Sequence, residues 1–155
     1  MELFTASWFT PLPDTVKRVG ICRYAPRGQK SGYRMFNRLA PGPWFNQVTP
    51  SRYMELYQEQ VLAPLDVDAM LRDLETLAEG NDVALLCFEK PRFVIGEPGH
   101  KNNWCHRRVV SARLDELGIR CPEYGVAEDE IGLRAEQWVR DELRRVRAGR
   151  AGSLV

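Results

Sequence analysis

The sequence predicts an α/β fold, a single three-layer domain in which a small, mostly parallel sheet of about four strands is flanked by helices and followed by a C-terminal amphipathic helix. Three observations support this prediction. The 155 residues suffice for one domain. Short β-rich runs alternate with segments of helical periodicity. The run Val83–Phe88 is wholly apolar, as in a central parallel strand buried on both faces. We expect residues 1–150 to form the domain and 151–155 to be a frayed tail.

The N-terminal third predicts two strands and then an irregular region. Leu3–Phe9 and Val16–Cys22 are short runs rich in β-forming residues. Residues 25–47 are rich in Pro, Gly and Arg, so we expect a long irregular excursion with a turn or two of helix near Tyr33–Leu39. Loops of this length in compact domains are usually functional.

Two helices are predicted before the central strand. Thr49 and Pro50 favour an N-cap and a first helical position, and the helical spacing that follows continues to Ala63. Asp66 is expected to cap a second helix, which ends at Gly80.

The chain after the central strand predicts a loop, a helix, a strand and a final helix. A polar loop is expected over residues 90–104, and a helix over Cys105–Leu117, with Gly118 as its stop. Ile119–Tyr124 is expected to be the fourth strand. Residues 129–148 show an apolar stripe at helical spacing, which predicts the amphipathic helix.

Charge is unevenly distributed, although the formal net charge is +1. Residues 15–54 hold eight bases and no acid, whereas residues 55–89 hold nine acids and a single base, Arg72. This asymmetry indicates either an anionic partner or ion pairing between the two segments, and both alternatives stay open. Aromatic residues are interleaved with the bases, as on surfaces that bind nucleotides or single strands.

The sequence also bears on compartment and on the cysteines. No apolar run approaches the ~20 residues that span a bilayer, and the N-terminus does not resemble a signal peptide. We therefore expect a cytoplasmic protein without a membrane partner. The four cysteines form no CxxC pair, so they are expected to be reduced thiols without any disulfide.

Candidate site residues follow from the predicted topology. Ligands of parallel sheets bind beyond the carboxyl ends of the strands, and a helix N-terminus favours anions. We therefore expect a site for a nucleotide, an oligonucleotide or a phosphate-bearing small molecule at this edge. The expected anion-binding residues are Arg23, Arg27, Arg34, Lys90 and Arg107. The expected catalytic residues are Cys105, His106 and Glu89.

Two of these residues allow more than one interpretation. Cys105 could be a thiolate nucleophile, because a helix N-terminus and nearby cations lower a thiol pKa. The favoured alternative is a structural cysteine beside His106 and Arg107, which would bind the anion. Glu89 could be a general base, but we favour an ion pair that orients Arg23 or Arg107.

A zinc site is a further alternative. It would combine His100, Cys105 and His106 with Cys87 or Cys121, but these spacings match no standard zinc motif. Neither a metal nor another cofactor is therefore expected.

Four motifs resemble one known family. They are Arg23-x-x-Pro26-Arg27-Gly28, Tyr53-x-x-x-Tyr57, Leu85-Leu86-Cys87-Phe88-Glu89 and Cys105-His106-Arg107. Their order and spacing over roughly residues 17–125 resemble the bacterial and phage family called domain of unknown function 488. Other members often carry Asp-Val-Arg at the second strand and a Ser after the proline, whereas this chain has Ile21-Cys22-Arg23 and Gly28, so a role of that Asp would not carry over. The resemblance implies an α/β fold and an intracellular bacterial or phage origin, and it implies no particular activity.

Three classes of function remain. The sequence favours an intracellular protein that binds or processes a nucleotide or nucleic acid at this Arg/His/Glu/Cys site. The first alternative is a small-molecule enzyme with a Cys105 thiolate nucleophile. The second is a protein-interaction module without catalysis, which would bind its partner through the acidic helices or the C-terminal helix.

Overall fold

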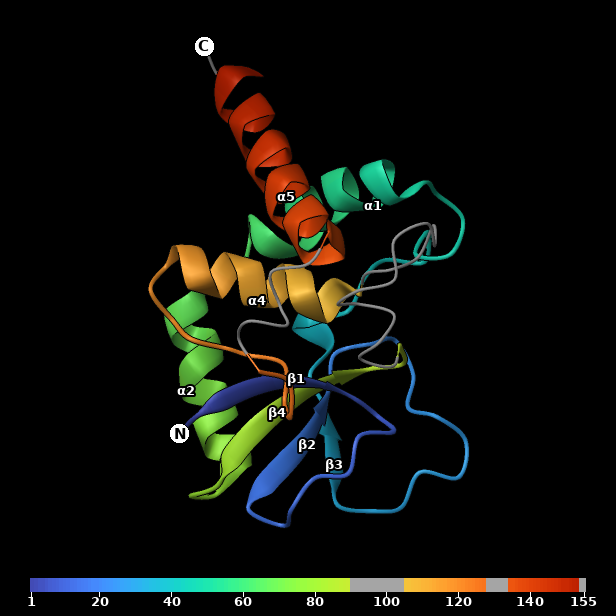
Figure 1. The fold of residues 1–155 in the computed structure, drawn as a ribbon, viewed down its shortest axis with the longest axis vertical. Coiled ribbons are helices and arrows are strands. Elements are labelled where there is room, and N and C mark those ends of the chain that lie inside the picture. Colours follow the sequence, from blue (N-terminus) through green and yellow to red (C-terminus); the bar gives the residue numbers. More distant parts are fainter. Residues whose placement is uncertain (90–104, 128–133, 154–155) are drawn as a thin grey trace.

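The computed structural model describes residues 1–89, 105–127 and 134–153, which form an α/β domain around one four-stranded sheet (Figure 1). All paired strands are parallel. In sheet order they are β1 (Leu3–Ser7), β4 (Asp82–Cys87), β2 (Val16–Gly20) and β3 (Tyr33–Met35). The predicted fold class is confirmed, and the apolar run at Val83 becomes an interior strand.

The register of the sheet determines which residues meet at its carboxyl edge. Ser7 of β1 lies opposite Cys87 of β4, and Gly20 of β2 lies opposite Leu86. The strands β2 and β4 therefore end side by side, and the residues that follow each strand share one edge.

Helices follow the strands, with a short 3-10 turn, η1 (Asn37–Leu39), after β3. The others are α1 (Pro50–Tyr57), its π-helical continuation η2 (Gln58–Leu62), α2 (Val67–Ala78), α4 (His106–Glu116) and α5 (Arg134–Ser153). Thr49 and Asp66 cap α1 and α2 through their side chains, as predicted. No helix within the described residues is long and apolar enough to cross a membrane.

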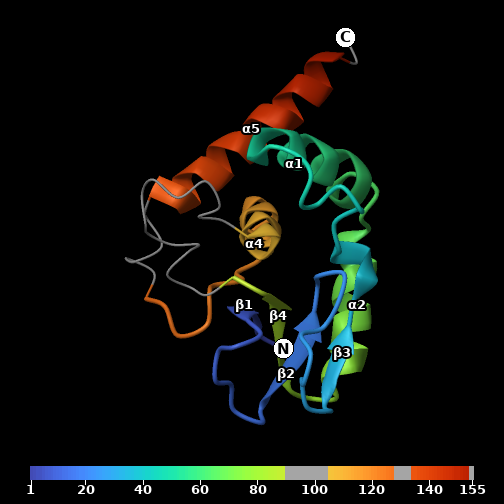
Figure 2. The same ribbon diagram turned by 90° about the vertical axis from the view of Figure 1, so that its right-hand side faces the viewer.

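The helices are arranged around α4. In both views α2 runs along the sheet, and α4 lies between the sheet and the pair formed by α1 and α5 (Figure 2). The first turn of α4 is therefore enclosed by other elements. This enclosure matters because the Cys105-His106-Arg107 motif lies at that end of the helix.

Alternate residues of β4 face two apolar cores. Val83 and Leu85 belong to the larger core, which includes side chains of the helices. Ala84 and Leu86 belong to a smaller core on the opposite face, together with Trp8 of the segment after β1. Cys22, Cys87 and Cys105 are members of this smaller core, at its carboxyl end.

Two predicted elements differ from the structure. The excursion at residues 25–47 contains β3, which pairs with β2 over three residues, and its helical part is limited to η1. The strand expected at Ile119–Tyr124 is reduced to a single bridge between Glu123 and Thr5. Pro122 lacks the N–H that a longer ladder would need. The predicted loop at 90–104 lies outside the described residues.

Candidate functional site

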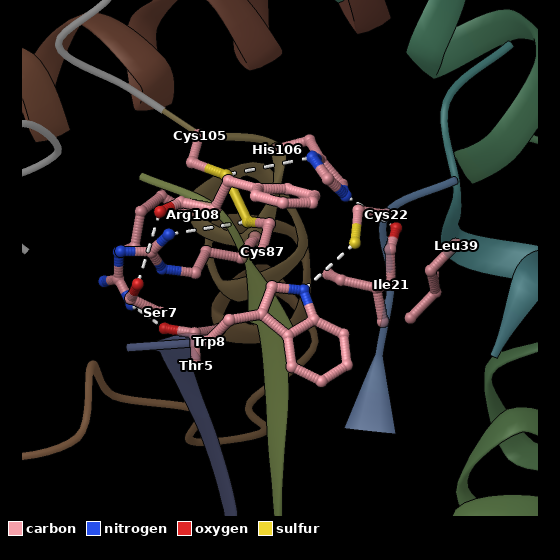
Figure 3. The surroundings of a disulfide bond; sticks show 12 residues. Thr5, Ser7, Trp8, Ile21, Cys22, Leu39, Cys87, Cys105, His106 and Arg108 are labelled. Carbon is pink, nitrogen blue, oxygen red and sulfur yellow. Dashed lines mark hydrogen bonds between the residues drawn. A yellow bond between two sulfur atoms is a disulfide. The ribbon is translucent and has the colours of Figure 1, made fainter. Parts of the chain in front are cut away.

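A pocket of about 340 Å³ lies at the carboxyl ends of β2 and β4. Residues that follow β2, residues that follow β4 and the start of α4 all contribute to its lining. The segment before α1 closes another side. Cys22, Cys87, Cys105 and His106 line the pocket and lie close together in Figure 3, and we call these four residues the floor of the pocket.

The structure brings some of the predicted site residues together. Four of them line the pocket: Arg23, Glu89, Cys105 and His106. Arg27 and Arg34 are exposed and do not line it, and Arg107 is buried behind it. Lys90 lies outside the described residues, as does His100 of the zinc alternative.

Arg23 is positioned by backbone and ring contacts. Its Nη1 donates a hydrogen bond of 3.2 Å to the carbonyl oxygen of Pro41, and its guanidinium lies 5.9 Å from the ring centroid of Tyr24. In the part of the chain that the structure describes, Arg23 forms no ion pair. Its positive charge is therefore available to a ligand in the pocket.

Ion pairing between the basic and acidic segments is limited. Within the described ranges, two pairs join them, Arg38 with Asp73 and Arg52 with Glu55. Most of the bases between residues 15 and 54 are thus not neutralised by the acidic segment. This result weakens the alternative in which the two segments pair with each other.

Aromatic rings surround the mouth of the pocket. Tyr24, Phe88 and Phe45 line the pocket and are 66%, 41% and 39% exposed. Large exposed apolar side chains gathered at one place usually mark a binding surface. Tyr53 adds a buried ring to the wall.

Glu89 does not form the predicted ion pair. Among the described residues it has no basic partner, and Arg107 pairs with Glu123 instead. The interpretation of Glu89 as the residue that orients Arg107 is therefore wrong. Glu89 lines the pocket, as do Cys87 and Phe88, which precede it in the chain.

Cys87 and Cys105 form a disulfide (Figure 3). The expectation of four free thiols is wrong for this pair, because the fold brings the end of β4 against the start of α4. Both residues are buried. Cys22 and Cys121 are free and buried, and burial raises the pKa of the Cys121 thiol to about 12.

Non-reducing peptide mapping is expected to find Cys87 linked to Cys105, with Cys22 and Cys121 recovered as free thiols. The intact oxidised chain should be lighter than the reduced chain by one pair of hydrogen atoms. The physical reason is that only Cys87 and Cys105 are brought into bonding contact. A linkage that involves Cys22 or Cys121 would contradict this prediction.

His106 is a neutral imidazole with a defined orientation. Its Nε2 lies 2.7 Å from the carbonyl oxygen of Ile21. A carbonyl only accepts hydrogen bonds, so Nε2 carries the ring proton and Nδ1 keeps its lone pair. Burial lowers the pKa of His106 to about 4. Nδ1 lies 3.8 Å from Cys105 Sγ.

A buried ionic network fixes the start of α4. Arg107 donates to both carboxylate oxygens of Glu123, at 3.0 Å and 2.9 Å. Arg108 pairs in the same two-pronged way with Glu136 of α5, at 3.1 Å and 2.8 Å. Thr5 of β1 accepts from Arg108 and donates to Glu123. The network thus ties α4 to β1, to α5 and to the segment after α4.

This network explains why Arg107 does not line the pocket. The remaining terminal nitrogen of Arg107, Nη1, donates to Cys87 Sγ at 3.4 Å. Arg107 therefore acts on the pocket through Cys87 rather than by direct contact with a ligand. When the disulfide is reduced, the Cys105 thiol and the His106 imidazole could act as a nucleophile and its base. The Cys87 and Cys105 thiols and His106 could also bind a metal ion.

Sequence analysis missed the partners of the two arginines. Glu123 and Glu136 are almost fully buried. They lie far from Arg107 and Arg108 along the chain, at spacings that no local sequence motif has, so the pairing could not be predicted. The sequence did contain one signal for these partners. Arg107 and Arg108 lie in the first turn of a helix, where positive charge interacts unfavourably with the helix dipole. Two arginines at this position are therefore expected to pair with carboxylates from other segments of the chain.

Comparison with family models, curated proteins and solved structures found no match to this chain. The resemblance to the family named above therefore stays a prediction.

Proposed function

We propose that the pocket binds a nucleotide, free or as the end of a single strand, with the phosphate at Arg23 and the base among the exposed rings. One observation carries this proposal. Three exposed aromatic rings and an arginine without an ion-pair partner among the described residues surround a single pocket. Positive charge for phosphate and rings for base stacking are the two features that such recognition needs.

Glu89 narrows the class of ligand. A carboxylate repels inorganic phosphate, but it accepts hydrogen bonds from ribose hydroxyls in many nucleotide sites. A ligand with both a phosphate and hydroxyl groups can use Arg23 and Glu89 together. The cavity volume of about 340 Å³ lies in the range typical of small-ligand sites.

Replacing Arg23 by alanine is expected to weaken binding of a nucleoside monophosphate about 10- to 100-fold. A hydrogen bond to a charged group contributes about 1.5–3 kcal/mol, which corresponds to this change in affinity. Affinity for the matching nucleoside should stay unchanged, because it has no phosphate. Isothermal titration calorimetry on the oxidised protein, with a chelator present, measures both ligands.

Arg72→Ala is the matched control for this experiment. Arg72 is an exposed arginine of α2 and does not line the pocket. Its removal changes net charge by the same amount and should leave affinity unchanged. Equal losses of nucleotide affinity in the two variants would mean that Arg23 acts through general electrostatics and not through contact with the phosphate. A wild-type chain that binds neither nucleotides nor short single strands would refute the proposal.

A second candidate function is supported by the 3.8 Å contact between Cys105 Sγ and His106 Nδ1. In the reduced protein this pair could act as a thiol nucleophile and its base. Alkylation of reduced Cys105 at neutral pH, in the presence of a chelator, tests it. An alkylation rate far above that of an ordinary thiol would support the role of Cys105 as a nucleophile. An ordinary rate would exclude this second function.

A further inference from the structure

We infer that reduction of the disulfide turns Cys87, Cys105 and His106 into a zinc site at the floor of the pocket. Their donor atoms all lie within 4.8 Å of one another, and all three residues are buried. Two soft thiolates and one imidazole are a donor set that suits tetrahedral zinc. The inference goes beyond the proposed function and does not depend on nucleotide binding.

The orientation of His106 fits a metal ligand. Metal-bound histidines generally donate their second ring N–H to a carbonyl or carboxylate, which fixes the tautomer and the ring plane. Nε2 of His106 already makes this hydrogen bond, with the carbonyl oxygen of Ile21. The lone pair on Nδ1 is therefore left on the side of Cys105 Sγ (Figure 3).

Both sulfur atoms lie beside groups that can stabilise a metal-bound thiolate. Cys105 is the N-cap of α4, and its side chain makes no capping hydrogen bond, so its sulfur is not used by the helix backbone. The helix N-terminus carries partial positive charge. At Cys87, the donor is Nη1 of Arg107, whose own charge is balanced by Glu123. Two thiolates and one Zn²⁺ sum to zero, so the buried site would be neutral.

Backbone geometry also suits an ion between the two sulfur atoms. The Cα atoms of Cys87 and Cys105 are 7.3 Å apart. Disulfides usually span about 4.4–6.8 Å between these atoms. The two backbones are thus slightly farther apart than in most disulfides, which favours an ion between the sulfur atoms over a wider opening of the backbone.

The disulfide form converts to the zinc-bound form through thiol–disulfide exchange with a dithiol, followed by metal binding. A dithiol reductant transfers two electrons and two protons to the Cys87–Cys105 disulfide, giving two thiols, while the reductant closes into its own disulfide. Zinc then replaces the two thiol protons, which pass to solvent. The three donors leave one position of a tetrahedral ion for water or for a ligand in the pocket, because all three residues line it.

Cobalt titration of the reduced full-length chain tests the inference. The protein is reduced with a dithiol, desalted without oxygen and titrated with Co²⁺ alone. We expect one ion per chain, sulfur-to-cobalt charge-transfer absorption, and displacement by Zn²⁺. Cys87→Ser and Cys105→Ser should lose this absorption. Cys22→Ser is the matched control, because serine can keep both hydrogen bonds of Cys22, from Trp8 and to Tyr24.

A second measurement keeps the test decisive if a serine variant fails to fold. Zn²⁺ should slow alkylation of the reduced wild-type chain at Cys87 and Cys105, and mass mapping identifies the protected thiols. Reduced wild-type protein without cobalt–sulfur absorption would overturn the inference, as would protection at Cys22 and Cys121 instead. Nucleotide binding is measured on the oxidised protein with chelator, so either proposal can fail without the other.

Discussion

Replacing Glu123 by glutamine is expected to lower the free energy of unfolding by about 3–5 kcal/mol. Glu123 accepts hydrogen bonds from Arg107 and from Thr5, and it lies within 4.0 Å of Arg108. All four residues are at most 1% exposed, so water cannot replace the missing charge. Breaking a buried ion pair by removal of one partner costs about this much, because the other charge stays buried and uncompensated. Urea unfolding measures the change.

Glu116→Gln, at the end of α4, provides the control. Glu116 forms ion pairs with Arg113 and Arg147, but its side chain is 32% exposed. Exposed pairs contribute about 0–1 kcal/mol, so this variant should unfold almost as the wild type does. If Glu123→Gln were equally mild, the network would not stabilise the fold. A combined Arg107→Leu and Glu123→Leu variant should be less damaged than the sum of the single changes, since no unpaired guanidinium from this pair remains buried.

Local and periodic signals predicted most of the fold. The apolar run at Val83–Phe88 identified β4, because a strand buried on both faces has no polar positions. The capping residues Thr49 and Asp66 located the starts of α1 and α2. These features depend on neighbours along the chain, so a single sequence contains them.

Elements that depend on tertiary pairing were not predictable in this way. β3 has three residues and, among the described strands, pairs with β2 alone, so it carries no periodic pattern and depends on its partner. Around Pro122 the chain lies beside β1, with Thr5 N donating to the Pro122 oxygen and Tyr124 N donating to the Thr5 oxygen. A strand was predicted over Ile119–Tyr124, but the proline prevents a continued ladder.

For the candidate site too, the placement of residues could be predicted from the sequence, but their side-chain partners could not. The rule for parallel sheets predicted that Arg23, Glu89, Cys105 and His106 would share one edge, and they line one pocket. The rule gave no information about side-chain partners. Arg107 was therefore predicted to bind a ligand, whereas Glu123, which follows it by 16 residues, neutralises it inside the protein.

The second large effect is expected at Gly20, the last residue of β2. A Cβ built there would lie 2.5 Å from a ring carbon of Trp8 and 2.6 Å from the sulfur of Met35. Trp8 is 3% exposed and packs edge-on against Tyr33, so its ring has little room to move. Gly20→Ala should therefore lower the free energy of unfolding by about 1–3 kcal/mol, the usual cost of overpacking. Thermal and urea unfolding measure it.

The same substitution at Gly149 should act in the opposite direction. Apart from its chain neighbours and the nearby backbone of α5, no described atom lies within 4 Å of a Cβ built at Gly149, and alanine is favoured over glycine in helices by about 1 kcal/mol at most. Trp8→Phe removes the ring atoms that a Cβ at Gly20 would meet, so adding it to Gly20→Ala should cost less than the sum of the two single changes. Strict additivity would mean that Gly20 and Trp8 do not contact each other. Because Trp8 Nε1 donates to Cys22 Sγ at 3.2 Å, Gly20→Ala should also speed alkylation of Cys22 in the folded protein, linking the packing of β2 to the floor of the pocket.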